Sequence, residues 1–149
     1  PTLDLAIRLV AALLLGGVIG IDRRLHGKPA GLRTMALVSL GAATFTLIGI
    51  EAMLQIYQAE QAAGIEQTIR LDTSRVIAGI VGGIGFLGAG AIIQGRGRVH
   101  GMTTASGIWM TAAVGVACGL GQFILAAIAT ALAFGVLVLL RQGSEEDGE

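Results

Sequence analysis

Charged residues are scarce in this sequence, since only 13% of its 149 residues are Asp, Glu, Lys or Arg while 54% are apolar. A soluble domain usually carries about 25% charged residues, so too few are present here to cover a water-facing surface. The stretch from Val99 to Leu140 contains none at all. As helix, it is long enough to cross a hydrocarbon layer of about 30 Å twice. The sequence therefore excludes an ordinary soluble domain and predicts an integral membrane protein.

Other absences narrow the function. Cys118 is the single cysteine, which excludes an intramolecular disulfide, and its apolar surroundings indicate an inert buried thiol. The formal net charge is zero, which argues against nucleic acid as a partner. His26 and His100 are the only histidines, and no spacing resembles a nucleophile with its base or a zinc-binding set. We therefore expect neither an enzyme nor a bound cofactor.

Five apolar runs predict an all-α, polytopic transmembrane bundle of about five spans in the lipid bilayer. The runs cover residues 3–21, 34–57, 76–93, 103–120 and 122–140. Residues 1–141 are expected to form this transmembrane domain, and the acidic residues 142–149 a short disordered tail.

The connections between these runs predict the orientation, because cytoplasmic loops are enriched in Lys and Arg. The first and third connections are basic, with Arg23, Arg24, Lys28, Arg33, Arg96 and Arg98. The second connection carries Glu60, Glu66 and Asp72, partly matched by Arg70 and Arg75. We expect the amino terminus outside the cell and the carboxyl terminus in the cytoplasm.

Small residues recur every fourth position in several runs, as in the GxxxG pattern through which membrane helices approach closely. The candidate packing glycines are Gly16, Gly20, Gly79, Gly83, Gly85, Gly88, Gly107 and Gly115. They predict a tightly packed bundle or a homodimer, although glycine is also simply common in membrane helices. Trp109 lies within the fourth run and is expected to be a packing anchor.

Three of these glycines, Gly83, Gly85 and Gly88, match the G-x-G-x-x-G pattern of dinucleotide-binding loops. That pattern needs a strand before it and an acidic residue after it. Here it lies inside an apolar run, and no acidic residue occurs between Asp72 and Glu145. The glycines are therefore expected to serve backbone contact, a kink or a helix break lining a cavity.

Polar residues gather at the predicted cytoplasmic ends of the first, second and fourth runs. They are Asp22, Arg23, Arg33, Thr34, Arg98, Thr103 and Thr104. Two helix N-termini with nearby arginines would suit an anionic ligand, a lipid headgroup or an acidic partner segment, with Asp22 restraining Arg23 or Arg33. The alternative is simple positive-inside topology with threonine caps.

A second polar group is expected near the outer face, where Arg8, Glu51, Asp72 and Arg75 would form one network. Asp4 and Arg8 could pair at i, i+4 along one helix. Alternatively, each side chain reaches the headgroups separately. Glu51 and Asp72 are weak candidates for a magnesium site, because Mg²⁺ prefers oxygen ligands but few carboxylates are available.

Four segments together resemble the MgtC/SapB family of bacterial inner-membrane proteins. They are Gly16–Arg24, Lys28–Val38, Asp72–Ile93 and Val99–Trp109, and they span most of the chain. The resemblance implies functional weight at Asp22, Arg23, Arg33, Thr34, Asp72, Arg75, Thr103, Thr104 and Trp109. It also implies adaptation to low magnesium, survival of pathogens inside host cells, and regulation of other membrane machinery, notably the proton-translocating ATP synthase.

Two functions follow as hypotheses. The first is a non-enzymatic inner-membrane protein, homodimeric, that regulates a membrane-protein partner through helix packing. The second is a cation transporter or channel for Mg²⁺, with Glu51 and Asp72 on its path and the glycines of the third run lining it. Flux of Mg²⁺ into sealed liposomes would distinguish them.

Overall fold

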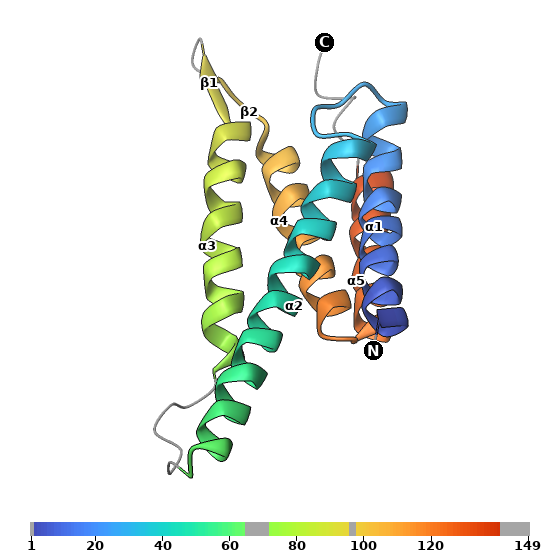
Figure 1. Cartoon of the computed structure of the whole chain (residues 1–149). Coiled ribbons are helices and arrows are strands. Elements are labelled where there is room, and N and C mark those ends of the chain that lie inside the picture. Colours follow the sequence, from blue (N-terminus) through green and yellow to red (C-terminus); the bar gives the residue numbers. More distant parts are fainter. Residues whose placement is uncertain (1, 65–71, 96–97, 141–149) are drawn as a thin grey trace.

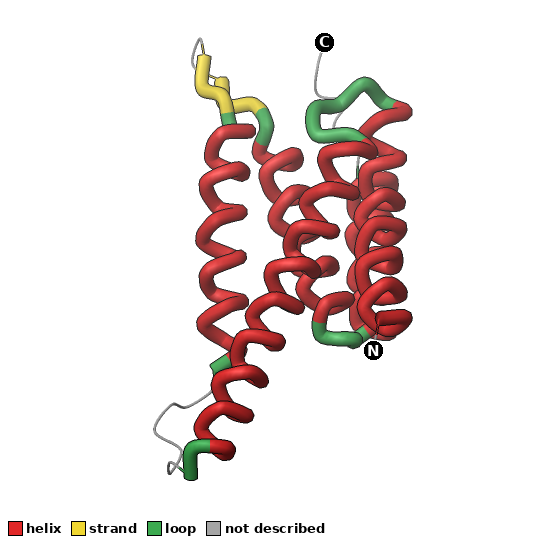
Figure 2. The backbone as a smooth tube through the Cα atoms, in the orientation of Figure 1, coloured by secondary structure: helices red, strands yellow, loops and turns green. Residues whose placement is uncertain are grey.

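The computed structural model describes residues 2–64, 72–95 and 98–140 of the chain. Five helices and a two-stranded hairpin make up this part (Figures 1 and 2). In chain order they are α1 (Thr2–Leu25), α2 (Leu32–Ala62), α3 (Thr73–Ala91), β1 (Ile93–Gly95), β2 (Arg98–His100), α4 (Met102–Gly119) and α5 (Phe123–Leu139). The predicted tail, residues 142–149, and the side chain of Arg98 lie outside the described residues.

The fold class predicted from the sequence is confirmed, because all five apolar runs are helices. Three of them, α1, α2 and α3, are long and apolar enough to cross a membrane by length and composition. Large apolar side chains cover much of the outside, for example Phe45 at 63%, Ile124 at 80% and Leu132 at 66% exposure. Such a surface suits lipid rather than water.

The ends of the bundle agree with the expected alternation. The α1–α2 loop, the β1–β2 hairpin and the end of α5 lie at one end of the bundle, and the start of α1 and the α4–α5 turn lie at the other (Figure 1). The two basic connections thus share one side of the molecule. Which side faces the cytoplasm stays a prediction from charge.

Helix α4 is the centre of the bundle, since it packs against each of the other four helices. Its interior face combines small and β-branched residues that meet small residues of its neighbours. Val114 and Cys118 lie in one buried cluster with Ala12 of α1, Ala43 of α2 and Ala126 of α5. Small side chains permit this close packing of helix backbones.

Glycines make the closest of these approaches. A Cβ added at Gly115 would lie 2.9 Å from the Ala42 Cβ, and one added at Gly119 would lie 2.9 Å from the Ala43 carbonyl oxygen. A Cβ on Gly20 would lie 2.7 Å from the Leu32 Cα. The same crowding surrounds Gly16, where the added atom would meet Ser39 and lie 2.8 Å from the Met35 oxygen. Glycines of α1 and α4 therefore lie at close contacts between helices of the chain, while their role in a homodimer stays a prediction.

Helix α3 behaves differently and lies at one edge of the bundle (Figure 1). Its only buried residue is Gly88, which faces Ala105 of α4. Near its start it also approaches α2, where a Cβ on Gly49 would lie 2.6 Å from a Val76 methyl group. α3 is continuous, so the glycines of the G-x-G-x-x-G pattern produce no helix break. They lie in a helix rather than in a strand-to-helix loop.

Two local features were not predicted, a pair of strands and two glycine N-caps. The connection between α3 and α4 is not a simple loop, because β1 and β2 pair antiparallel, with Ile93 opposite His100. Thr34 and Thr103 do not cap their helices either. The N-cap residues are Gly31 and Gly101, neither with a side-chain cap hydrogen bond, and Gly101 has a φ of 92° that favours glycine.

Candidate functional site

Arg23 is the core of the polar cluster at the basic end of the bundle. It lies in the last turn of α1 and is only 5% exposed, so its charge is held inside the protein. One of its terminal nitrogens donates to the Thr104 hydroxyl on α4 and, at 3.3 Å, to the Pro29 carbonyl oxygen. Arg23 therefore ties α1 to the start of α4 and to the α1–α2 loop.

The neighbouring Asp22 is also buried, at 6% exposure. Its Oδ1 lies 3.2 Å from Nδ1 of His26, one helical turn later, and its carbonyl oxygen lies 2.7 Å from the same nitrogen. The expected restraint of Arg23 by Asp22 stays a prediction, and the contact of Asp22 with His26 was not foreseen.

The remaining members of the predicted cluster do not join this core. Arg33, Thr34 and Thr103 are exposed, and the side chain of Arg98 lies outside the described residues. Thr104, by contrast, is 4% exposed and bound to Arg23. The cluster thus divides into buried residues, Asp22, Arg23 and Thr104, and exposed residues around them. Successive residues of a helix point in different directions, so neighbours in the sequence differ in burial. Only the exposed groups could meet an anionic ligand without displacing Arg23.

At the opposite end of the bundle, Arg8 makes a comparable connection. Its Nη1 donates to the Gly119 carbonyl oxygen at 2.9 Å, at the end of α4. Its Nε lies 2.9 Å from an Asp4 carboxylate oxygen, although this contact is not aligned as a hydrogen bond. The predicted Asp4–Arg8 pair is confirmed. A cation at a helix C-terminus is favourable, because the last carbonyl groups carry partial negative charge.

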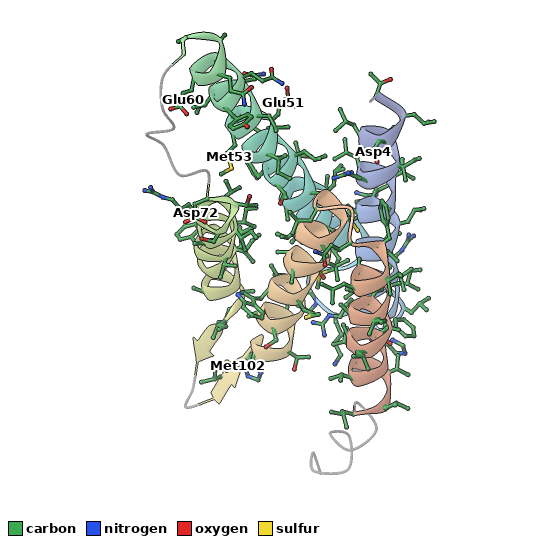
Figure 3. The ribbon with its side chains drawn as sticks, turned by 90° about the horizontal axis from the view of Figure 1, so that it is seen from below. Asp4, Glu51, Met53, Glu60, Asp72 and Met102 are labelled. Carbon is green, nitrogen blue, oxygen red and sulfur yellow. The ribbon has the colours of Figure 1, made fainter. Side chains whose placement is uncertain are left out.

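Glu51 of α2 lines the same pocket as this arginine. Glu51, Asp4 and Arg8 line one open pocket of about 520 Å³ between α1 and α2, at the end of the bundle opposite to the basic connections. The Gln55 side chain donates to Glu51 at 3.3 Å. Figure 3 labels Asp4 on α1 and Glu51 on α2.

Asp72 and Arg75 do not belong to this group. Asp72 is the N-cap of α3 and accepts a hydrogen bond from the Ser74 amide at 2.9 Å. In Figure 3 it lies on the side of α2 away from Asp4. No ion pair or hydrogen bond of the described residues links Arg8 or Glu51 to Asp72 or Arg75. The single outer network is therefore wrong, because α2 stands between its two halves.

The surroundings of Asp72 lower the pKa of its carboxyl group. The hydrogen bonds from Ser74, helped by the nearby positive charge of Arg75, hold the pKa of the Asp72 carboxyl below its usual range. Asp72 is thus ionised at neutral pH and serves as a helix cap. This role accounts for it without a bound metal.

The predicted packing residues fall into two groups. Gly107 and Gly115 face the interior, where a Cβ on Gly107 would lie 3.2 Å from the end of the Met35 side chain. Gly79, Gly83 and Gly85 are exposed, and a Cβ on any of them would meet no described atom within 4 Å. Trp109 is 52% exposed. It therefore does not belong to the buried core of the described chain, and its role as a packing anchor stays a prediction.

The described residues contain no group of three His, Cys, Asp or Glu side chains placed to hold a metal ion. Glu51 and Asp72 lie apart, so they do not form a shared magnesium site. Cys118 is buried, as expected. The sequence missed Pro29 and Gly119 as partners of the two arginines, since backbone carbonyl groups give no signal in a sequence.

Comparison with known proteins supplies the family context. The model of the MgtC family matches residues 9–145. Protein SrpB of Synechococcus elongatus is 43% identical over 137 residues, covering 86% of this chain and 70% of its own length. Protein MgtC of Salmonella typhimurium is 40% identical over 139 residues, covering 93% and 53%. The putative magnesium transporter YhiD of Escherichia coli is 35% identical over 141 residues, covering 95% and 62%.

This chain thus spans only about half to two thirds of the length of most of the relatives it matches. No solved structure matches it.

Proposed function

Since this chain belongs to the MgtC family, we propose that it is an inner-membrane protein of magnesium homeostasis that regulates other membrane proteins through helix packing. The name of one relative, putative magnesium transporter YhiD, supports the link to magnesium. Because the chain covers 53% of MgtC, any activity of the longer protein is part of the proposal.

The observation that carries this proposal is the uncovered glycine face of α3. Gly79, Gly82, Gly83 and Gly90 all have open space where a Cβ would lie. At 100° per residue they project from one side of the helix, opposite Gly88, and Phe86 stands among them with 82% exposure. Helices in lipid associate by close backbone contact, so such a face suits another membrane helix.

Two kinds of binding partner would fit this glycine face of α3. A second copy of the chain would form a homodimer, with Phe86 of each copy over glycines of the other. A different membrane protein would be the regulated partner, and the proton-translocating ATP synthase is the one that the family resemblance implies. We propose that the partner takes the face in the regulated state.

A growth experiment tests the proposal. In a strain lacking this protein, the wild-type chain should support growth at limiting Mg²⁺, and Gly83→Leu should not, because the larger side chain fills the helix-binding face. Ala131→Leu is the matched control, since Ala131 is exposed on α5, far from that face in the sequence. Equal growth with Gly83→Leu and the wild type would contradict the proposal.

Transport of Mg²⁺ is the second candidate, favoured by the printed name of the YhiD relative. Purified protein in sealed liposomes should show no more Mg²⁺ uptake than protein-free liposomes if regulation is its role. Uptake that Glu51→Gln abolishes would replace the regulatory proposal, because Glu51 would then lie on a transport path.

A further inference from the structure

The open pocket between α1 and α2 combines an apolar wall with charged groups. Six of its ten lining residues are apolar, and Leu5, Ile48 and Leu54 expose 44%, 58% and 47% of their surface. The other four are Asp4, Arg8, Glu51 and Gln55. A site of this composition suits an amphipathic ligand better than a bare ion.

The charged side chains of the pocket differ in how many partners they have. Arg8 already interacts with the Asp4 carboxylate and the Gly119 oxygen. Its guanidinium has five N–H donors, so some remain for a further acceptor. Glu51 is exposed, and in the described part of the chain only the Gln55 amide binds it. The pocket therefore offers an available carboxylate and a partly engaged arginine.

Along the membrane normal, the pocket lies at the level of the phospholipid headgroups. Asp4 lies 19 residues before Arg23 on α1, and Glu51 lies 19 residues after Leu32 on α2. At 1.5 Å per residue each interval is about 28 Å, close to the thickness of the hydrocarbon layer. Asp4 and Glu51 are thus at the boundary opposite to the basic end of the bundle.

We propose that this pocket binds a phospholipid whose headgroup carries both a phosphate and a primary ammonium. The ammonium donates hydrogen bonds to Glu51, and the phosphate accepts them from the remaining N–H groups of Arg8. The acyl chains lie along Leu47 and Ile48, which line the pocket on the hydrocarbon side of Glu51. A divalent cation fits less well, because Asp4 is already paired with Arg8, whose positive charge repels a cation. The described residues also supply no third Asp, Glu, His or Cys beside Asp4 and Glu51. The inference requires insertion in a membrane but not the regulatory role of α3.

Lipid retention measured by native mass spectrometry tests this site. The full chain is purified from bilayers containing equal amounts of phosphatidylethanolamine, phosphatidylcholine and phosphatidylglycerol. The wild type should retain phosphatidylethanolamine preferentially, since the choline ammonium has no N–H and glycerol carries no positive charge. Glu51→Gln should reduce that preference about fivefold, as expected for one exposed charged hydrogen bond.

Glu60→Gln is the matched control, because Glu60 lies on the same helix outside the pocket. It should leave the preference unchanged. Equal retention of the three lipids by the wild type, or an unchanged preference in Glu51→Gln, would overturn the proposal. Displacement of the lipid by Mg²⁺ from the wild type but not from Glu51→Gln would also overturn it, since the pocket would then be a cation site.

Discussion

Two arginines of α1 hold the two ends of α4. Arg23 binds Thr104 in the first turn of α4, and Arg8 binds the Gly119 carbonyl group in its last turn. The environments are opposite, because a helix dipole favours a cation at the C-terminus and disfavours one at the N-terminus. Asp22, the adjacent residue, brings a buried carboxylate to the same end of α1. The buried arginine therefore depends on its partners, which makes the Thr104 hydroxyl a testable contact.

Replacing Thr104 with Val should lower the free energy of unfolding in detergent by about 1–3 kcal/mol, since a buried charged donor loses its acceptor. Thr103→Val is the control, because Thr103 is exposed and adjacent. It should change the free energy by less than about 0.5 kcal/mol. Equal effects of the two substitutions on the unfolding midpoint would show that the Arg23–Thr104 contact adds no stability.

The lowered pKa of Asp72 leads us to expect that the stability of the protein depends on pH. Because its pKa is lowered in the folded protein, the ionised cap adds stability at neutral pH, and this is lost as the pH falls below the ordinary Asp range toward the folded pKa. The thermal unfolding midpoint of the wild type should therefore drop more between pH 7 and acidic pH than that of Asp72→Asn. Parallel pH profiles of the two proteins would contradict the capping role.

At the scale of helices, glycine has two different uses in this chain. In α1 and α4 it allows contact with α2, and at Gly16, Gly20, Gly115 and Gly119 the backbone of α2 leaves no room for a side chain. In α3 most glycines face open space. A glycine repeat alone does not distinguish these cases, because the spacing is the same whether the neighbouring helix belongs to the same chain or to another.

Gly115→Ala and Gly83→Ala should therefore differ. The first places a methyl group 2.9 Å from the Ala42 Cβ and 2.8 Å from the Ser39 carbonyl carbon, so it should destabilise the bundle by about 1–3 kcal/mol. The second meets no described atom, and the helix propensity of Ala should leave the stability equal or slightly higher. The thermal midpoint in detergent measures both. A loss of stability in Gly83→Ala would place this glycine in a packed interface within one chain.

The sequence predicted the helices well because hydropathy is read along the chain. The predicted run 103–120 differs by one residue at each end from α4, and the local Asp4–Arg8 pair followed from the i, i+4 spacing. The bond between Arg23 and Thr104 joins residues 81 positions apart, and only the packing of α1 on α4 specifies it. The predicted network of Glu51 with Asp72 is absent from the described part of the chain for a similar reason. Two residues at the same depth in a membrane can lie on different sides of a helix.

The whole molecule is a four-helix unit, α1, α2, α4 and α5, to which α3 is attached along one edge. The contacts of Arg8 and Arg23 hold α4 in place. Among the described elements, α3 packs mainly against α2 and α4. An edge helix with an open glycine face is suited to intermolecular packing. The central claim is therefore that this face of α3 contacts another membrane protein or a second copy.

Cysteine cross-linking in native membranes tests this claim most directly, in a chain whose Cys118 is first replaced by Ala. Gly83→Cys should form a cross-linked product, whereas Ile80→Cys should not, because Ile80 packs inward against α2 and α4. Absence of any product from Gly83→Cys, or equal products from the two variants, would contradict the account.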